Sequence, residues 1–157
     1  RPIHILEIGT YTGYATLCLA EGMQENGSID TIDINEELED IQKKYFDLSD
    51  WKGQITQHLG DALEIIPNLN KKYDLVFIDA DKDNYLNYWE MILPVMNKGG
   101  IILSDNVLWS GKVLEEPNPK DLSTNVLLEY NKKLKEDSRV ETVLLPIRDG
   151  LTVSRVL

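Results

Sequence analysis

Residues 73–84 read YDLVFIDADKDN, a stretch in which an apolar run leads directly into acidic residues. Its first half, residues 73–78, is a nearly continuous apolar run, as expected for a strand buried on both faces of a parallel sheet. Its second half carries three aspartates, which fall where the chain leaves that strand. Ligands of open α/β sheets bind outside the carboxyl ends of the strands. The stretch therefore predicts both a sheet and the edge at which its site lies.

Strand-like and helix-like segments alternate on both sides of this stretch. Strands are expected at residues 4–8, 28–32, 55–59, 73–78, 101–104, 140–145 and 151–156. Helices are expected over residues 14–23, after the N-cap Asn35, over 62–69, over 85–92 and around 127–134. Two of them have apolar residues on one face, namely Leu38, Ile41, Tyr45 and Leu48 after Asn35, and Tyr85, Tyr88, Trp89 and Ile92 in the helix over 85–92. The alternation predicts a three-layer α/β sandwich with a mostly parallel seven-stranded sheet. The last two strands are joined too closely for a parallel crossover, so we expect an antiparallel hairpin at the sheet edge.

Length and composition indicate one globular domain over residues 1–157. Apolar residues make up 42% and charged residues 27% of the chain, an ordinary mixture for such a domain. No apolar run approaches the roughly 20 residues that span a bilayer, and no signal peptide is visible, so we expect no membrane partner. The single cysteine excludes an internal disulfide and fits a cytoplasmic protein. A net charge of −11 disfavours nucleic acid as a partner.

Each of the first five expected strands ends beside a carboxylate. These residues are Glu7, Asp33, Asp61, Asp79 and Asp105. A single acid at such a position is commonly a helix cap. Five acids on one rim of the sheet instead predict a polar site.

The loop after the first strand reads EIGTYTGY, residues 7–14. Gly9 and Gly13 allow sharp turns and a close approach of the backbone to a ligand. Tyr11 stands where the dinucleotide fingerprint has its second glycine, and the ending of a P-loop is missing. The loop therefore favours a nucleoside without phosphates. Asp33 stands where an acid typically accepts hydrogen bonds from ribose hydroxyls. The alternatives, a helix cap or a solvated residue, are disfavoured because Asn35 already serves as the cap.

The run 79–84, DADKDN, allows two interpretations. Its spacing resembles the start of an EF-hand, but Asn84 occupies the glycine position and a strand precedes the run, so this interpretation is disfavoured. Alternatively, Asp79 meets Asp105 and Asn106 from the neighbouring strand. Two carboxylates and an amide oxygen suit Mg²⁺ or Ca²⁺. Zinc is disfavoured because no histidine falls at the carboxyl end of a strand.

The strings LEIGTYTGY, FIDADKDNY and LSDNVLWSGKV strongly resemble the cation-dependent O-methyltransferases, which include the catechol and caffeoyl-CoA enzymes. The resemblance continues to the terminal LPIRDGLTVSRVL. It implies a Rossmann-like class I methyltransferase fold. It also implies that the protein uses S-adenosylmethionine and a divalent cation, for which Mg²⁺ is favoured over Ca²⁺ and Mn²⁺. The expected reaction methylates one of two vicinal hydroxyls on a small aromatic acceptor. Family members carry a helical segment before the first strand, whereas this chain begins at that strand. This start is expected either of a gene product that lacks the segment or of a trimmed fragment.

The resemblance also implies residue roles, several of which the strand-end pattern indicates independently. The cofactor would be bound by Glu7, Gly9, Gly13, Asp33, Asp61, Ala62 and Asp81. The cation would be bound by Asp79, Asp105 and Asn106, and Lys82 would be the general base. Trp109 is expected to line the acceptor pocket, with simple packing of its loop as the alternative. We also expect a homodimer.

Three other functions stay open at this point. The chain could be a non-catalytic nucleoside-binding module, or a methyltransferase for a hydroxylated base in tRNA, which the acidic charge disfavours only weakly. An NAD-dependent dehydrogenase is disfavoured by the missing GxGxxG motif.

Overall fold

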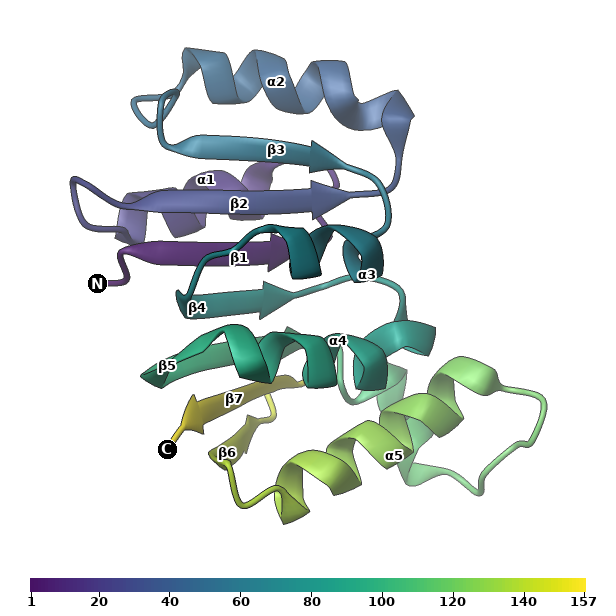
Figure 1. Cartoon of the computed structure of the whole chain (residues 1–157). Coiled ribbons are helices and arrows are strands. Elements are labelled where there is room, and N and C mark those ends of the chain that lie inside the picture. The colour runs from purple at the N-terminus through teal and green to yellow at the C-terminus, as the bar shows by residue number, and fades with distance from the viewer.

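The computed structural model describes residues 1–157 and contains one seven-stranded sheet flanked by helices (Figure 1). The strands are β1 (His4–Ile8), β2 (Ser28–Asp33), β3 (Ile55–Leu59), β4 (Tyr73–Ile78), β5 (Met96–Asp105), β6 (Val140–Leu145) and β7 (Leu151–Val156). Their order is β3-β2-β1-β4-β5-β7-β6. The first five strands are parallel, and β7 pairs antiparallel with both β5 and β6. The predicted mostly parallel sheet with an antiparallel C-terminal hairpin is confirmed.

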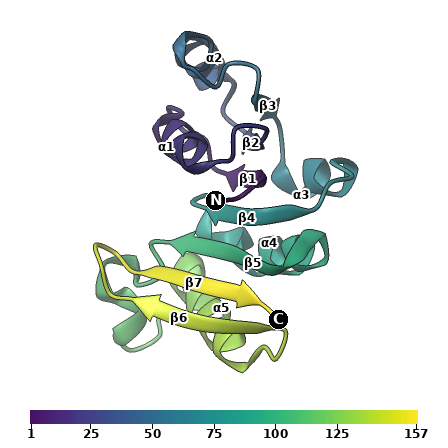
Figure 2. The same ribbon diagram turned by 90° about the vertical axis from the view of Figure 1, so that its left-hand side faces the viewer.

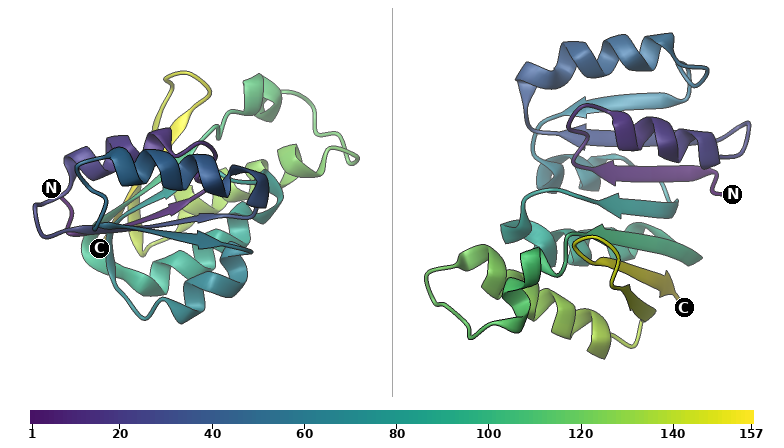
Figure 3. Two further views of the ribbon diagram at one scale, coloured as in Figure 1. Left: turned by 90° about the horizontal axis from the view of Figure 1, so that it is seen from above. Right: turned by 180° about the vertical axis from the view of Figure 1, so that it is seen from behind.

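Helices cover both faces of the sheet and complete the three layers. They are α1 (Tyr14–Gly22), α2 (Glu39–Leu48), α3 (Ala62–Ile65), α4 (Tyr85–Ile92) and α5 (Leu122–Glu136). In the turned views, α1 and α2 lie on one side of the sheet, and α3, α4 and α5 lie on the other (Figures 2 and 3). None of the helices combines the length and the apolar character needed to cross a bilayer.

The main core lies between the sheet and the second group of helices. It is a cluster of 20 buried residues that includes Val76 and Ile78 of β4 and Trp89 of α4. The predicted apolar spacing of α4 is confirmed, because Tyr85, Tyr88, Trp89 and Ile92 are all buried. A smaller cluster of four residues packs under α1 on the opposite face.

The apolar residues expected on one face of α2 do not form its buried face. Ile41, Tyr45 and Leu48 are 41%, 48% and 74% exposed, whereas the buried residues of this helix are Gln42 and Phe46. The glycine loop sets this rotation of the helix. The Gln42 amide donates a hydrogen bond to the Tyr11 carbonyl at 2.5 Å, and the Phe46 ring fills the space where a Cβ on Gly13 would sit, 2.7 Å from that ring.

The predicted start of β5 at residue 101 was wrong. The strand begins at Met96, before Gly99 and Gly100, rather than after them. The register with β4 shifts between the pairs Tyr73–Met96 and Leu75–Ile101. Gly99 has a φ of +79°, a conformation that glycine adopts readily. The strand therefore passes through the glycines as an irregularity instead of turning there.

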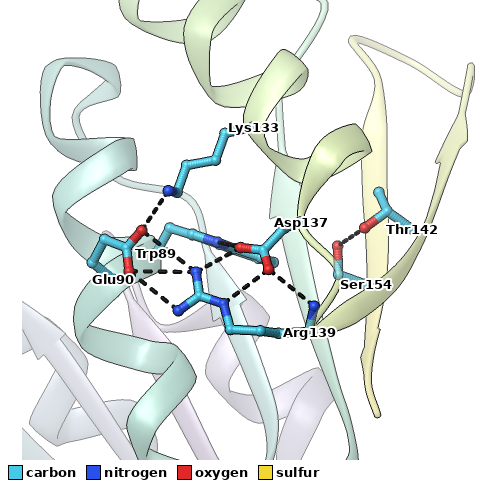
Figure 4. Close-up of polar contacts among 7 residues, drawn as sticks. All are labelled: Trp89, Glu90, Lys133, Asp137, Arg139, Thr142 and Ser154. Carbon is cyan, nitrogen blue, oxygen red and sulfur yellow. Dashed lines mark hydrogen bonds and ion pairs between the residues drawn. The ribbon is translucent and has the colours of Figure 1, made fainter.

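A polar cluster fastens the C-terminal part of the chain to α4 (Figure 4). Asp137 follows α5, and its carboxylate accepts hydrogen bonds from Trp89 Nε1 at 3.1 Å and from Arg139 Nε at 2.8 Å. Glu90 of α4 pairs with Lys133 at 2.5 Å and with Arg139 at 3.4 Å. Hydrogen bonds from Arg139 hold the pKa of Asp137 well below its usual range. The cluster thereby helps to fix α4, whose first turn reaches the site described next.

Candidate functional site

A cavity of about 460 Å³ opens at the carboxyl ends of β1, β2, β3 and β4. This volume lies within the roughly 300–1,000 Å³ usual for small-molecule sites. Five of the seven predicted cofactor residues line it, namely Gly9, Asp33, Asp61, Ala62 and Asp81. Of the five acids predicted at the strand ends, three line this cavity, namely Asp33, Asp61 and Asp79.

The glycine loop and Asp33 form one wall of this first cavity. Asp33 accepts hydrogen bonds from the backbone N–H of Tyr11 at 2.6 Å and of Asn35 at 2.8 Å. Gly9 has a φ of +99°, and a Cβ there would lie 2.0 Å from the Asp79 carbonyl. Only glycine permits this contact between the loop and the end of β4. Asp33 thus both braces the loop and faces the cavity.

Asp61 and Asp81 also combine two roles. The Asp61 carboxylate caps α3 by accepting from the Leu63 N–H at 2.8 Å, as expected of an acid before a helix. Asp81 accepts from the Tyr88 hydroxyl at 2.5 Å and from the Asn84 amide at 2.7 Å. Both acids still line the cavity, so the capping and ligand interpretations are compatible.

Two predicted cofactor residues lie outside the cavity wall. Gly13 packs against Phe46. Glu7 is completely buried beneath the loop, where it accepts hydrogen bonds from the hydroxyls of Thr16 and Thr31. Its second carboxylate oxygen, Oε1, is buried without a partner. Burial raises the pKa of Glu7 to about 7.

The buried Glu7 should make stability fall as pH rises from about 4.5 to about 7. In this window the folded protein keeps a proton on Glu7 that the unfolded chain has released, so raising the pH favours unfolding. In the Glu7→Gln variant the side chain is uncharged at every pH, so this pH dependence of the stability should disappear. One pKa unit corresponds to about 1.4 kcal/mol. Between pH 4.5 and pH 8, the free energy of unfolding of the variant should therefore rise relative to that of wild type by up to about 3 kcal/mol. Urea unfolding of cofactor-free protein at pH 4.5 and pH 8 measures it, and an unchanged difference would contradict it.

A second cavity, of about 440 Å³, adjoins the first. The two share the wall formed by Asp79, Ala80 and Asp81. Asn106 also lines the second cavity, with its backbone at a φ of +60°. Asp105, one residue earlier, accepts the Asn106 N–H on its own carboxylate at 2.8 Å. The predicted oxygen ligands thus come from the adjacent ends of β4 and β5.

Lys82 lies between these two strand ends. Its side chain is only 5% exposed, and its Nζ lies 3.4 Å from Asp79 Oδ1 and 3.1 Å from the Asp105 carbonyl. Burial lowers the pKa of this ammonium from its ordinary value, although the charges of Asp79 and Asp105 oppose the change. A lysine with a lowered pKa can exchange a proton closer to neutral pH. This placement is that of a candidate base rather than of a solvated surface lysine.

Trp109 begins the 3₁₀ segment η5 (Trp109–Leu114) and lines the second cavity. Its ring centre lies 5.9 Å from Lys82 Nζ. The residue also packs against the main core, and its backbone has a φ of +51°. The two predicted roles, acceptor wall and loop packing, are therefore compatible.

Sequence reasoning missed two aromatic residues at the site. Tyr88 lines the first cavity and binds Asp81. Tyr11 lines the same cavity, whereas in the sequence it stands out only as a departure from the dinucleotide motif. The helical spacing of Tyr88 correctly indicated burial, but spacing carries no signal for where a hydroxyl points.

The sheet and its rim define the class to which the chain belongs, that of the Rossmann-like methyltransferases. An O-methyltransferase from Bacillus cereus, solved in complex with SAH, superposes with a TM-score of 0.93 at 27% identity, covering 99% of this chain and 74% of its own. The O-methyltransferase TomG from Streptomyces achromogenes, solved in complex with SAM, gives a TM-score of 0.92 at 26% identity, covering 99% and 73%.

The chain belongs to the O-methyltransferase family, whose sequence profile matches residues 3–157. A caffeoyl-CoA O-methyltransferase from Medicago sativa is 36% identical over 161 residues, which cover 96% of this chain and 65% of that protein. Caffeoyl-CoA O-methyltransferase 5 from Nicotiana tabacum is 37% identical, with coverages of 96% and 67%. The chain thus spans about two thirds of the length of the curated relatives that it matches.

Proposed function

We propose that this chain transfers a methyl group from S-adenosylmethionine to one hydroxyl of a vicinal pair on a small aromatic acceptor, with the help of a divalent cation. The observation that carries the proposal is the shared wall of the two cavities. A nucleoside-sized cavity and an oxygen-lined cavity open on either side of residues 79–81. A methyl donor in the first would face an acceptor in the second, and methyl transfer depends mainly on such positioning.

Asp79 and Asn106, which line the second cavity, and Asp105, which directly precedes Asn106, would suit a hard divalent cation. Asp79, Asp105 and Asn106 offer two carboxylates and one amide oxygen, the ligand types that Mg²⁺ prefers. No group of three or more His, Cys, Asp or Glu side chains is arranged to hold a metal ion, and the proposed set contains only two such residues. When bound, the cation would polarise the acceptor hydroxyl and favour its ionisation.

The chain's own side chains supply the remaining functions. Lys82, buried between the ends of β4 and β5, would take the proton from the acceptor hydroxyl at its Nζ. Trp109 offers an aromatic face to an aromatic acceptor. Asp33 would accept hydrogen bonds from the ribose of the donor, and Asp81 would lie near its methionine end.

The ribose role predicts that Asp33→Ala weakens S-adenosylmethionine binding by about 1–3 kcal/mol, the usual cost of leaving a hydrogen-bonding group without its partner. Isothermal titration calorimetry measures this loss. Asp40→Ala is the matched control, because Asp40 is an exposed acid of the nearby helix α2. If both variants bind the cofactor with wild-type affinity, Asp33 does not hold the ribose.

A methylation screen with Mg²⁺ present tests the acceptor class. It compares simple catechols, hydroxycinnamoyl thioesters and tRNA bearing hydroxylated bases. The names of the plant relatives favour the first two, so we expect turnover with an aromatic vicinal diol. Turnover with tRNA alone would support the alternative acceptor, and cofactor binding without any turnover would support a non-catalytic nucleoside-binding module. A cytoplasmic location and a homodimer remain part of the proposal.

A further inference from the structure

Tyr85 is completely buried although its side chain carries a hydroxyl. It is the first residue of α4, and the hydroxyl reaches back to the carboxyl ends of two strands. The oxygen lies 2.9 Å from the Asp105 carbonyl of β5 and 3.3 Å from the Ile78 carbonyl of β4. Asp79 directly follows Ile78. The Tyr85 hydroxyl therefore bridges the two strand ends that present the proposed cation ligands.

The same hydroxyl accepts a hydrogen bond from Lys82 Nζ. A hydroxyl has one proton and two lone pairs, so it can donate to a strand carbonyl while it accepts from the lysine. The Lys82 ammonium has two other acceptors, the Asp105 carbonyl and the Asp79 carboxylate. It also lies 4.4 Å from the centre of the Tyr85 ring, within the range of a cation–π contact. Tyr85 thus contacts the lysine nitrogen in two ways, through its hydroxyl and through its ring.

We propose that Tyr85 is a positioning residue for methyl transfer, which holds the Lys82 amine between the ends of β4 and β5. Tyr85 lines neither cavity, so it would act through Lys82 rather than by touching donor or acceptor. The inference rests on the proposed function, because it assumes that Lys82 receives the acceptor proton. It adds a residue whose burial and helical spacing mark it only as part of the core.

The core offers a matched control in Tyr130. This residue is also completely buried, its hydroxyl shares a hydrogen bond of 2.6 Å with Ser104, and its ring packs edge-on against Tyr85 at 5.3 Å. It makes no hydrogen bond to Lys82. Tyr85→Phe and Tyr130→Phe each remove one buried hydroxyl from the same core, but only the first removes a partner of the lysine.

The kinetic test compares these two variants. A misplaced catalytic group can cost up to about 100-fold in rate, so Tyr85→Phe should lower kcat by about 10- to 100-fold with little change in KM for either substrate. Tyr130→Phe should keep kcat within roughly twofold, even if both variants melt at lower temperature. In a Lys82→Ala background, Tyr85→Phe should add less than about twofold. Equal losses of kcat in the two tyrosine variants, or full additivity with Lys82→Ala, would overturn the proposal.

A second readout does not depend on turnover. In ¹⁵N NMR of lysine ammonium groups, a buried, hydrogen-bonded ammonium exchanges its protons slowly and stays visible. Wild type should show one such signal that Lys82→Ala removes, Tyr85→Phe shifts or broadens, and Tyr130→Phe keeps. If the wild-type spectrum lacks this signal, the proposal is contradicted before any tyrosine variant is measured. If the signal is present but no acceptor turns over, methyl transfer fails as the function, and with it the role of Tyr85, while the contact itself stands.

Discussion

Replacing Asp105 with alanine is expected to abolish methyl transfer and to leave S-adenosylmethionine binding close to the wild-type value. Asp105 ends β5 beside the second cavity, whereas the walls of the first cavity come from β1 to β4 and the segments that follow them. Loss of its carboxylate should remove one cation ligand and leave the remaining pair too weak to hold the ion in place.

Asp105→Ala is tested by measuring turnover and cofactor affinity on the same preparation. Calorimetry with S-adenosylmethionine shows whether the first cavity is intact, and added Mg²⁺ should restore chelator-treated wild type but not the variant. Asp50→Ala, which removes an exposed acid after α2, is the control for the loss of one negative charge. A variant that turns over at the wild-type rate would exclude Asp105 from the ligand set.

Replacing Lys82 with alanine should lower kcat by about 10²–10⁴, the usual range for a lost general base. The loss should shrink at high pH, where the acceptor hydroxyl ionises without help. Binding of Mn²⁺ should persist, since Lys82 donates hydrogen bonds at the site and is not one of the oxygen ligands.

Lys98→Ala provides the control for Lys82, because it removes an exposed lysine near the start of β5, at the opposite end of that strand from Asp105. The informative measurement is the ratio of wild-type to variant kcat across pH, from about 7 to about 10. A ratio that stays constant over this range would argue that Lys82 only supports the structure.

Much of the fold could be predicted because its strands have unambiguous sequence patterns. Residues 73–78 were expected to form a strand and do so as β4. The acids at the strand ends could also be predicted to gather, since parallel strands that start on one side of a sheet must end together on the other. Asp33, Asp79 and Asp81 accordingly line one cavity.

The remaining features depend on contacts that a linear pattern does not contain. The rotation of α2 follows from Gln42 and Phe46 meeting the glycine loop, although apolar spacing favoured the neighbouring face. Glu7 was expected at the cofactor, but the structure closes it in beneath the loop. Tyr85 was expected in the core and lies there, but the direction of its hydroxyl is set by the ends of two strands far apart in the sequence.

If the chain transfers methyl groups with the help of a divalent cation, its activity must depend on that cation. Labelled methyl transfer from S-adenosylmethionine to a catechol acceptor is followed in Mg²⁺, in excess chelator, and in chelator followed by excess Mg²⁺. The proposed site predicts transfer in the first condition, loss in the second and recovery in the third. Undiminished transfer in excess chelator would contradict the cation site and leave Asp79, Asp105 and Asn106 without a role in the reaction.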